Sequence, residues 1–290
     1  MQEMNEILEL KTVALFIELR LFLVVSLLYL TAVILYLFHF FAKDEYTGRL
    51  GTSVVVLATV IHTFIIIFRW WEASRPPFQT LFESLSWFAW CSNATFLFLM
   101  SKKPRIHLAG LPVSLLAAWA MFFALLSRDP APPPLSPPLQ SSWFLWHVII
   151  AFMSYAVFVV ACSVELAYLY IRNRTHSMGL TAEDVERFHT MAFILVAVGF
   201  PLLTFGIVSG AAWANDAWGR FWSWDPKETW SLITWTVFAA YLHVMKIPRW
   251  RDKYGPYVNI LGFFCMIITF IGINWISKLL GIPSMHVYAV

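Results

Sequence analysis

Six tryptophans lie within one short stretch of this chain, residues 213–235. The cations Arg220 and Lys227 lie among them, and apolar segments long enough to cross a bilayer flank the stretch on both sides. Indole rings offer flat apolar faces and cations pair with carboxylates, so the combination suits a large flat ligand that carries carboxylates. Haem is such a ligand. The tryptophans assigned to this platform are Trp213, Trp218, Trp222, Trp224 and Trp230.

Two histidines are placed to bind an iron ion over this platform. His147 lies about one turn inside the span that follows a proline-rich stretch, and His286 follows the last apolar segment. A bis-histidine haem needs two neutral imidazoles on opposite faces of the iron. One such histidine alone is more often satisfied by backbone or water, but two around six tryptophans favour ligation.

A third histidine, His243, lies deeper in the chain's last-but-one span. It is 17 residues beyond Pro226, which corresponds to roughly 25 Å along a helix and places it near the opposite membrane boundary. A histidine inside a span is a functional candidate, although near a span end it could simply reach the interface. His62 has no obvious partner. The other histidines are interpreted as ordinary: His39, His107, His176 and His189.

Other roles could account for parts of this stretch. An interfacial aromatic belt places one or two tryptophans per span end on both faces of the membrane, and a carbohydrate platform usually adds several acidic or amide groups. Here only Asn215, Asp216 and Asp225 are near the tryptophans. The order Asp225, Pro226, Glu228 is typical of a helix N-terminus, so Asp225 is predicted to cap a helix, a role compatible with a ligand nearby.

The composition indicates that a membrane surrounds these side chains. The chain is 60% hydrophobic and 13% charged, against about 25% charged in soluble domains. Spans need roughly 20 apolar residues each, and these tracts are too evenly apolar for barrel strands. We predict an all-α polytopic membrane protein with about eight transmembrane helices. The apolar stretches are about 21–41, 50–68, 81–100, 107–127, 143–171, 190–212, 226–246 and 257–280.

Charge predicts the orientation. The loops after the first, third, fifth and seventh spans hold twelve Lys or Arg, and the opposite loops and tails hold seven. Because positive loops face the cytoplasm, both termini and the tryptophan-rich loop are predicted to lie outside. The net charge of +3 comes mostly from the cytoplasmic loops and does not suggest nucleic acid. No Cys-x-x-Cys is present, which excludes a thiol oxidoreductase or a carrier of its own covalent haem.

The chain divides into three predicted parts. Residues 1–127 form a four-span bundle, and residues 128–142 hold six prolines and form a stiff outer connector. Residues 143–290 form a haem-handling four-span unit, with the tryptophan loop at 211–230.

Residues 218–230, WGRFWSWDPKETW, resemble the tryptophan-rich WWD signature of haem-handling membrane proteins. The KETW ending resembles the CcsA (ResC) family, the membrane subunit of the system II cytochrome c synthase. The similarity runs from Trp143 to the C-terminus, with a weaker trace at 77–84. Two positions depart from the family pattern: Met285 precedes His286 where Leu is usual, and Ser74-Arg75 stands where Gly-His is common.

The resemblance implies specific roles. His147 and His286 would be the axial ligands of haem b, the bound substrate, on the outer platform, and Arg220 or Lys227 would neutralise its propionates. His243 would bind haem at a second position within the membrane, where a CcsB-type partner supplies the opposite ligand. The substrate protein would be apocytochrome c, and the location a bacterial inner membrane or a thylakoid membrane.

Three functions fit the sequence. The preferred one is a cytochrome c synthase (haem lyase) subunit, active with its CcsB partner, in which haem passes outward from His243 to the platform. The second is a non-covalent haem exporter or chaperone. The third is a di-haem electron-transfer protein, which needs paired histidines about 13–14 residues apart; the chain's spans hold only His62, His147 and His243 well inside them.

Overall fold

The computed structural model describes residues 2–102, 106–127, 133–174 and 181–281, and every regular element in these ranges is helical. Eight of the described helices have 19 residues or more. The elements are α1 (Gln2–Ala42), α2 (Glu45–Ala73), α3 (Leu81–Lys102), α4 (His107–Leu126), the 3-10 turn η1 (Pro137–Gln140), α5 (Ser142–Ile171), α6 (Ala182–Trp218), α7 (Pro226–Val244), α8 (Pro248–Ile267), the π turn η3 (Ile268–Gly272) and α9 (Ile273–Leu280).

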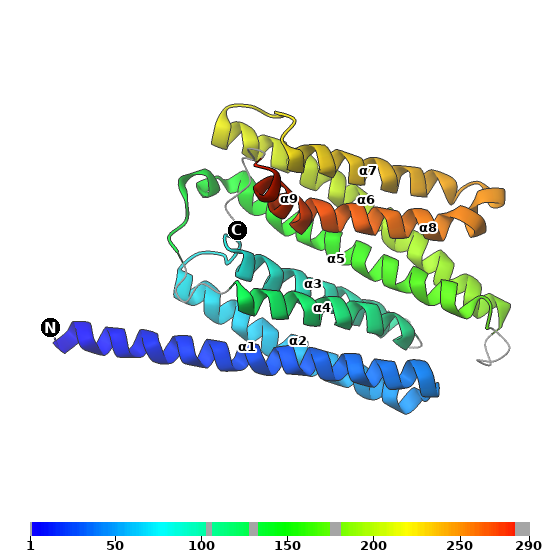
Figure 1. The fold of residues 1–290 in the computed structure, drawn as a ribbon, viewed down its shortest axis with the longest axis horizontal. Coiled ribbons are helices and arrows are strands. Elements are labelled where there is room, and N and C mark those ends of the chain that lie inside the picture. Colours follow the sequence, from blue (N-terminus) through cyan, green and yellow to red (C-terminus); the bar gives the residue numbers. More distant parts are fainter. Residues whose placement is uncertain (1, 103–105, 128–132, 175–180, 282–290) are drawn as a thin grey trace.

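Successive helices run up and down, so their connections fall alternately at the two ends of the molecule (Figure 1). The α2–α3, α4–α5 and α6–α7 connections share one end, which we call the tryptophan end. The α1–α2, α5–α6 and α7–α8 connections lie at the other end. The α5 helix lies in the middle and contacts α3, α4, α6 and α8.

Six of the described helical stretches are long and apolar enough to cross a membrane. The sequence predicted about eight spans, and the two predicted spans outside this set are those of α3 and α7. Polar residues make these two helices less apolar than the other six. Examples are Glu83 and Asn93 in α3, and Lys227 and Glu228 in α7. Most of α3 is buried among its neighbours, so protein rather than lipid surrounds its polar groups.

The stretch predicted as a loop at 211–230 is mostly helical. The α6 helix continues to Trp218, and α7 begins at Pro226. Only the segment from Gly219 to Asp225 is non-helical. The tryptophans are therefore distributed over a helix end, a short turn and a helix start, and these elements fix where each ring lies.

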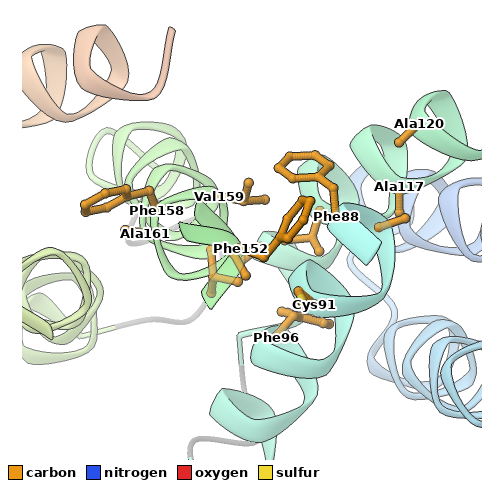
Figure 2. Packing of buried hydrophobic residues seen from close by; sticks show 14 of the residues in the cluster. Phe88, Cys91, Phe96, Ala117, Ala120, Phe152, Phe158, Val159 and Ala161 are labelled. Atoms are coloured by element: carbon orange, nitrogen blue, oxygen red, sulfur yellow. The ribbon is translucent and has the colours of Figure 1, made fainter. Parts of the chain in front are cut away.

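The core is continuous from the first four helices to the last. Figure 2 shows Phe88 of α3 close to Phe152 and Val159 of α5. Phe270 of η3 contacts both Phe88 and Phe152, with ring centroids 5.1 and 5.7 Å away. The two halves of the chain are thus packed against each other through α3, α5 and η3.

Four helices meet at one aromatic stack. Phe158 of α5 lies on Phe238 of α7, with ring centroids 3.8 Å apart. Gly199 of α6 faces Phe158 and Gly262 of α8 faces Phe238, and a Cβ atom at either glycine would lie only 2.7 or 2.8 Å from the ring. The absent side chains let α5–α8 approach closely, which holds the elements around the site in a fixed arrangement.

Candidate functional site

A cavity opens at the tryptophan end, between α5, α6 and the first turns of α7. Its empty space is about 1190 Å³, counted out to its open mouth. Ligand pockets are lined mostly by apolar and aromatic side chains, with a few polar groups that fix the ligand's orientation. The lining is dominated by Phe, Trp, Leu, Ile and Val side chains, with a few polar groups that include His147, Lys227 and Glu228.

His147 is held in the cavity wall by the neighbouring helix. Its Nδ1–H donates to the carbonyl oxygen of Gly206 on α6, at 2.7 Å. Its ring lies nearly parallel to the indole of Trp213, with an interplanar angle of 16° and centroids 5.9 Å apart. A proton fixed on Nδ1 selects the tautomer that binds a metal through Nε2. Both contacts therefore orient an imidazole for ligation.

The packing of this imidazole depends on a glycine. A Cβ atom at Gly210 would lie 2.7 Å from His147 Nδ1 and 2.8 Å from its Cε1. Any larger residue at position 210 would push the ring away from its present place. No local sequence pattern marks this glycine, because its role depends on a contact between two helices.

The structure brings together two of the five predicted platform tryptophans. Trp213 and Trp222 line the cavity. Trp218 packs edge-on against Trp213, with centroids 4.9 Å apart. Trp224 and Trp230 are outside the lining, and Trp224 is 67% exposed. Trp213 is itself 4% exposed, so it contributes one face to the wall rather than an open shelf.

The turn between α6 and α7 is held by reciprocal capping. Asp225 accepts a hydrogen bond from the Lys227 N–H at 3.1 Å, and Glu228 accepts from the Asp225 N–H at 3.2 Å. Glu228 also accepts from the Ser223 N–H at 2.8 Å. Gly219 ends α6 with a φ of 72°. These contacts fix the approach of Trp222 to the cavity.

The two predicted cations lie in different environments. Lys227 lines the cavity in the first turn of α7 and is half-buried. Arg220 is exposed and outside the lining. Glu228 shares the lining with Lys227, but its carboxylate is engaged with the turn through Ser223 and Asp225. A carboxylated ligand in the cavity would therefore meet Lys227 first.

Three further histidines were considered in the sequence: His243, His286 and His62. His243 is exposed in the last turn of α7, at the far end of that helix from the cavity. His286 lies outside the described residues. His62 is fully buried and hydrogen-bonded on both ring nitrogens, to Tyr29 at 3.2 Å and Ser86 at 2.8 Å.

Two of the histidines that were not expected to be ligands have polar partners. His189 Nδ1 lies 2.6 Å from the carboxylate of Glu165. His107 Nδ1 lies 3.1 Å from the hydroxyl of Thr52. Each pair satisfies one ring nitrogen of a buried imidazole within the helix packing.

Several cavity residues were not anticipated as site residues. Phe78, Gln79 and Ser84 come from the start of α3 and the segment before it, Leu139 comes from the proline-rich connector, and Phe270 comes from η3. The only sequence signal for this group was the weak family trace at 77–84. Three segments distant in sequence thus line the cavity together with the tryptophan stretch.

The residues present fit haem as a bound substrate. The cavity is lined mostly by apolar side chains, and it contains an oriented imidazole. It also has one half-buried ammonium, which suits a propionate. These are the chemical requirements of haem: apolar walls for the macrocycle, an axial nitrogen for the iron and a cation for the carboxylates.

Comparisons with known proteins show which family the chain resembles. The family model described as "Cytochrome C assembly protein" matches residues 78–280. "Cytochrome c biogenesis protein CcsA" of Cyanophora paradoxa is 33% identical, over 85% of this chain and 92% of the relative. The CcsA of Synechococcus sp. (strain RCC307) is 36% identical, over 83% of this chain and 85% of the relative.

A comparison with solved structures shows a similar fold. "Cytochrome c Heme Lyase CcmF" superposes with a TM-score of 0.67 at 17% sequence identity. The match covers 92% of this chain and 51% of the CcmF chain, so this chain spans about half of that protein's length. At this identity the likeness concerns the arrangement of helices.

Proposed function

This chain belongs to the cytochrome c assembly protein family, and we propose that it is the haem-handling subunit of a cytochrome c synthase. In that role it exports haem and presents it at the outer face of the membrane. There the haem is attached by thioether bonds to the Cys-x-x-Cys-His segment of an apocytochrome c. The observation that carries the proposal is the imidazole of His147, oriented by Gly206 inside a tryptophan-walled cavity.

Residues in and near the cavity share the holding of the substrate. His147 Nε2 is the first axial ligand, and His286 supplies the second. Trp213 and Trp222 bound the macrocycle with apolar faces and exclude water from the iron. Lys227 pairs with a propionate, and Arg220 assists from the rim.

The attachment chemistry requires positioning more than a catalytic base. Each thiol S–H adds across one vinyl group: a new C–S bond forms, and the hydrogen is taken up by the neighbouring carbon. The step needs no external oxidant. Fixing two vinyl groups against two thiols raises their effective concentration, which accounts for several kcal/mol of barrier, up to about 7–11 in well-oriented systems.

The membrane arrangement is part of the proposal. All eight long helices cross the membrane, with both termini and the tryptophan end on the non-cytoplasmic side of a bacterial inner membrane or a thylakoid. His243, at the opposite end of α7, ligates haem before export together with a histidine of a CcsB-type partner. Its exposure on the helix surface supports a ligand shared with another chain.

Covalent haem attachment tests this function directly. The chain is expressed with a CcsB-type partner and a Cys-x-x-Cys-His reporter in a host without its own maturation system. We expect haem-stained reporter from the native chain and a loss of at least about ten-fold from His147→Ala, because one lost ligand interaction of ~1.4 kcal/mol already gives that factor.

The controls separate the competing functions. Added imidazole should restore haem binding to His147→Gly, because a free ligand can occupy the emptied position. Unstained reporter, with haem still bound to the purified native chain, would favour the non-covalent carrier. A His147→Ala variant with an unchanged haem spectrum would refute the ligand assignment.

A further inference from the structure

Arg75, between α2 and α3, joins two segments at the edge of the cavity. The side chain is buried, with 7% of the residue exposed. Its guanidinium donates to both carboxylate oxygens of Glu83, at 3.1 and 3.3 Å. It also donates to the carbonyl oxygen of Pro133 in the proline-rich connector, through Nε at 3.2 Å and Nη2 at 3.0 Å. One side chain thus ties the start of α3 to the connector.

Glu83 links Arg75 to the backbone of the segment before α3. Its carboxylate accepts hydrogen bonds from the N–H groups of Gln79 at 2.8 Å and Thr80 at 3.2 Å. The hydroxyl of Thr80 accepts from the Glu83 N–H in return, at 3.2 Å. The side-chain amide of Gln79 then donates to the carbonyl of Pro134, at 3.2 Å. The segment and the connector are therefore linked at adjacent points.

Both linked segments form walls of the cavity. Phe78 and Gln79 line it from the α2–α3 segment, and Leu139 lines it from the connector. The far end of the connector is held separately, because Trp213 Nε1 donates to the Pro138 carbonyl at 2.7 Å. Arg75 thus anchors the connector at Pro133, and Trp213 anchors it at Pro138.

The chemistry at this position requires an arginine. A guanidinium presents five N–H donors in a planar fork, so it can bind both oxygens of a carboxylate and a carbonyl at the same time. A lysine ammonium is a compact point charge and cannot reproduce this geometry. The contacts by which Glu83 and Thr80 cap α3 do not involve the Pro133 carbonyl. The hydrogen bonds from Arg75 to Pro133 therefore hold the connector and play no part in capping the helix.

We propose that Arg75 is a positioning residue for the haem cavity, which bridges Glu83 to Pro133 and so holds two of the cavity's walls in place. Arg75 itself is outside the cavity lining. The identity of the ligand rests on the proposed function, whereas the position of the walls does not. The first half of the chain therefore contributes to the haem site through a polar bridge.

The test compares two conservative variants of the full chain, Arg75→Lys and Arg69→Lys. Arg69 is a matched control, since it is also buried and pairs with the same Glu83 at 3.5 Å, but its second partner is Glu18 of α1 at 3.2 Å. Haem b is bound to each purified protein, and its release to excess apomyoglobin is followed. We expect release about ten-fold faster from Arg75→Lys, with the spectrum of bound haem unchanged because His147 is untouched.

The control should release haem at close to the native rate. Equal release from the two variants, or a lower melting temperature of Arg75→Lys without faster release, would overturn the proposal and leave Arg75 a purely structural residue.

A second readout does not depend on haem. Leu139→Cys is introduced into each background and its reaction with a maleimide is timed. Leu139 is 4% exposed, so labelling should be slow in the native background and about ten-fold faster with Arg75→Lys. Equal rates in the Arg75→Lys and Arg69→Lys backgrounds would overturn the proposal. If the native chain binds no haem, the proposed function fails while this comparison still decides the role of Arg75.

A milder variant covers the case in which Arg75→Lys does not accumulate. Gln79→Ala removes the side-chain bond to Pro134 and one lining side chain, and it leaves the Arg75 contacts in place. Faster labelling of Leu139→Cys in that background supports the bridge, and unchanged labelling counts against it.

Discussion

At the scale of single residues, the orientation of His147 depends on α6. We expect Gly210→Ala to displace the imidazole, because the new Cβ would lie 2.7 Å from Nδ1. Overpacking of this kind costs about 1–3 kcal/mol, which corresponds to a loss of haem affinity of about five- to 150-fold. A haem titration of the purified chain measures the affinity, and the absorption spectrum reports the axial ligand.

Gly206→Ala is the matched comparison on the same helix. Its Cβ would meet Ala151 at 3.7 Å, an ordinary contact, and the carbonyl that accepts from His147 is retained. Both variants gain about 1 kcal/mol of helix propensity, so general helix destabilisation does not explain a difference. We expect the smaller loss from Gly206→Ala. Equal losses would contradict a specific clash at the His147 ring.

At the scale of elements, two capping boxes allow a local test. Asp225→Ala removes the N-cap of α7, at a cost of about 1 kcal/mol, and loosens the turn that carries Trp222. We expect faster hydrogen exchange at the Ser223 amide and haem release about five-fold faster. Thr181→Ala removes the equivalent cap of α6 at the molecule's other end.

This second variant should lose similar stability and keep the native rate of haem release. A thermal melt and a release assay on both proteins give the comparison. Faster release from Thr181→Ala as well would show that the effect is global rather than local to the turn.

Local rules made part of this architecture predictable. The Asp-Pro-x-Glu order places a helix start at Pro226, and α7 begins there. Each predicted apolar stretch falls within described helix or helix-end residues. The continuation of α6 to Trp218 was not predicted, because a dense tryptophan stretch resembles an aromatic loop in sequence. In the fold, the Trp213 indole is buried and donates a hydrogen bond to the connector. These contacts stabilise the helical conformation of α6 around Trp213.

The cavity was predictable only where its residues belong to recognisable local patterns. His147 and Trp222 come from recognisable motifs, and both line it. Phe78 and Leu139 reach the same wall from distant segments, and Gly210 acts through a contact between helices. Such contributions depend on tertiary contacts, which no local pattern in one sequence specifies.

At the scale of the whole molecule, the number of crossings is testable by cysteine labelling. Ser74→Cys and Ser101→Cys, both at exposed positions, should react with an impermeant maleimide from opposite sides, because α3 crosses. Arg220→Cys and Lys246→Cys should react from opposite sides, because α7 crosses. Intact cells and inverted vesicles provide the two sides, and the buried native cysteines provide a low background. Arg220→Cys and Lys246→Cys labelled from one side would place α7 within a single leaflet.

The π turn η3 has a consequence for the phase of the last helix. In the turn Ile268–Gly272 the Ile273 N–H bonds to the Ile268 carbonyl, five residues back. Such a turn holds one residue more than an α turn, and each helical residue accounts for roughly 100° of rotation. Deleting one residue here would restore a plain helix and rotate all of α9 by about a quarter turn. The surplus residue thus sets the azimuth of the chain's final helix, independently of which side chains that helix carries.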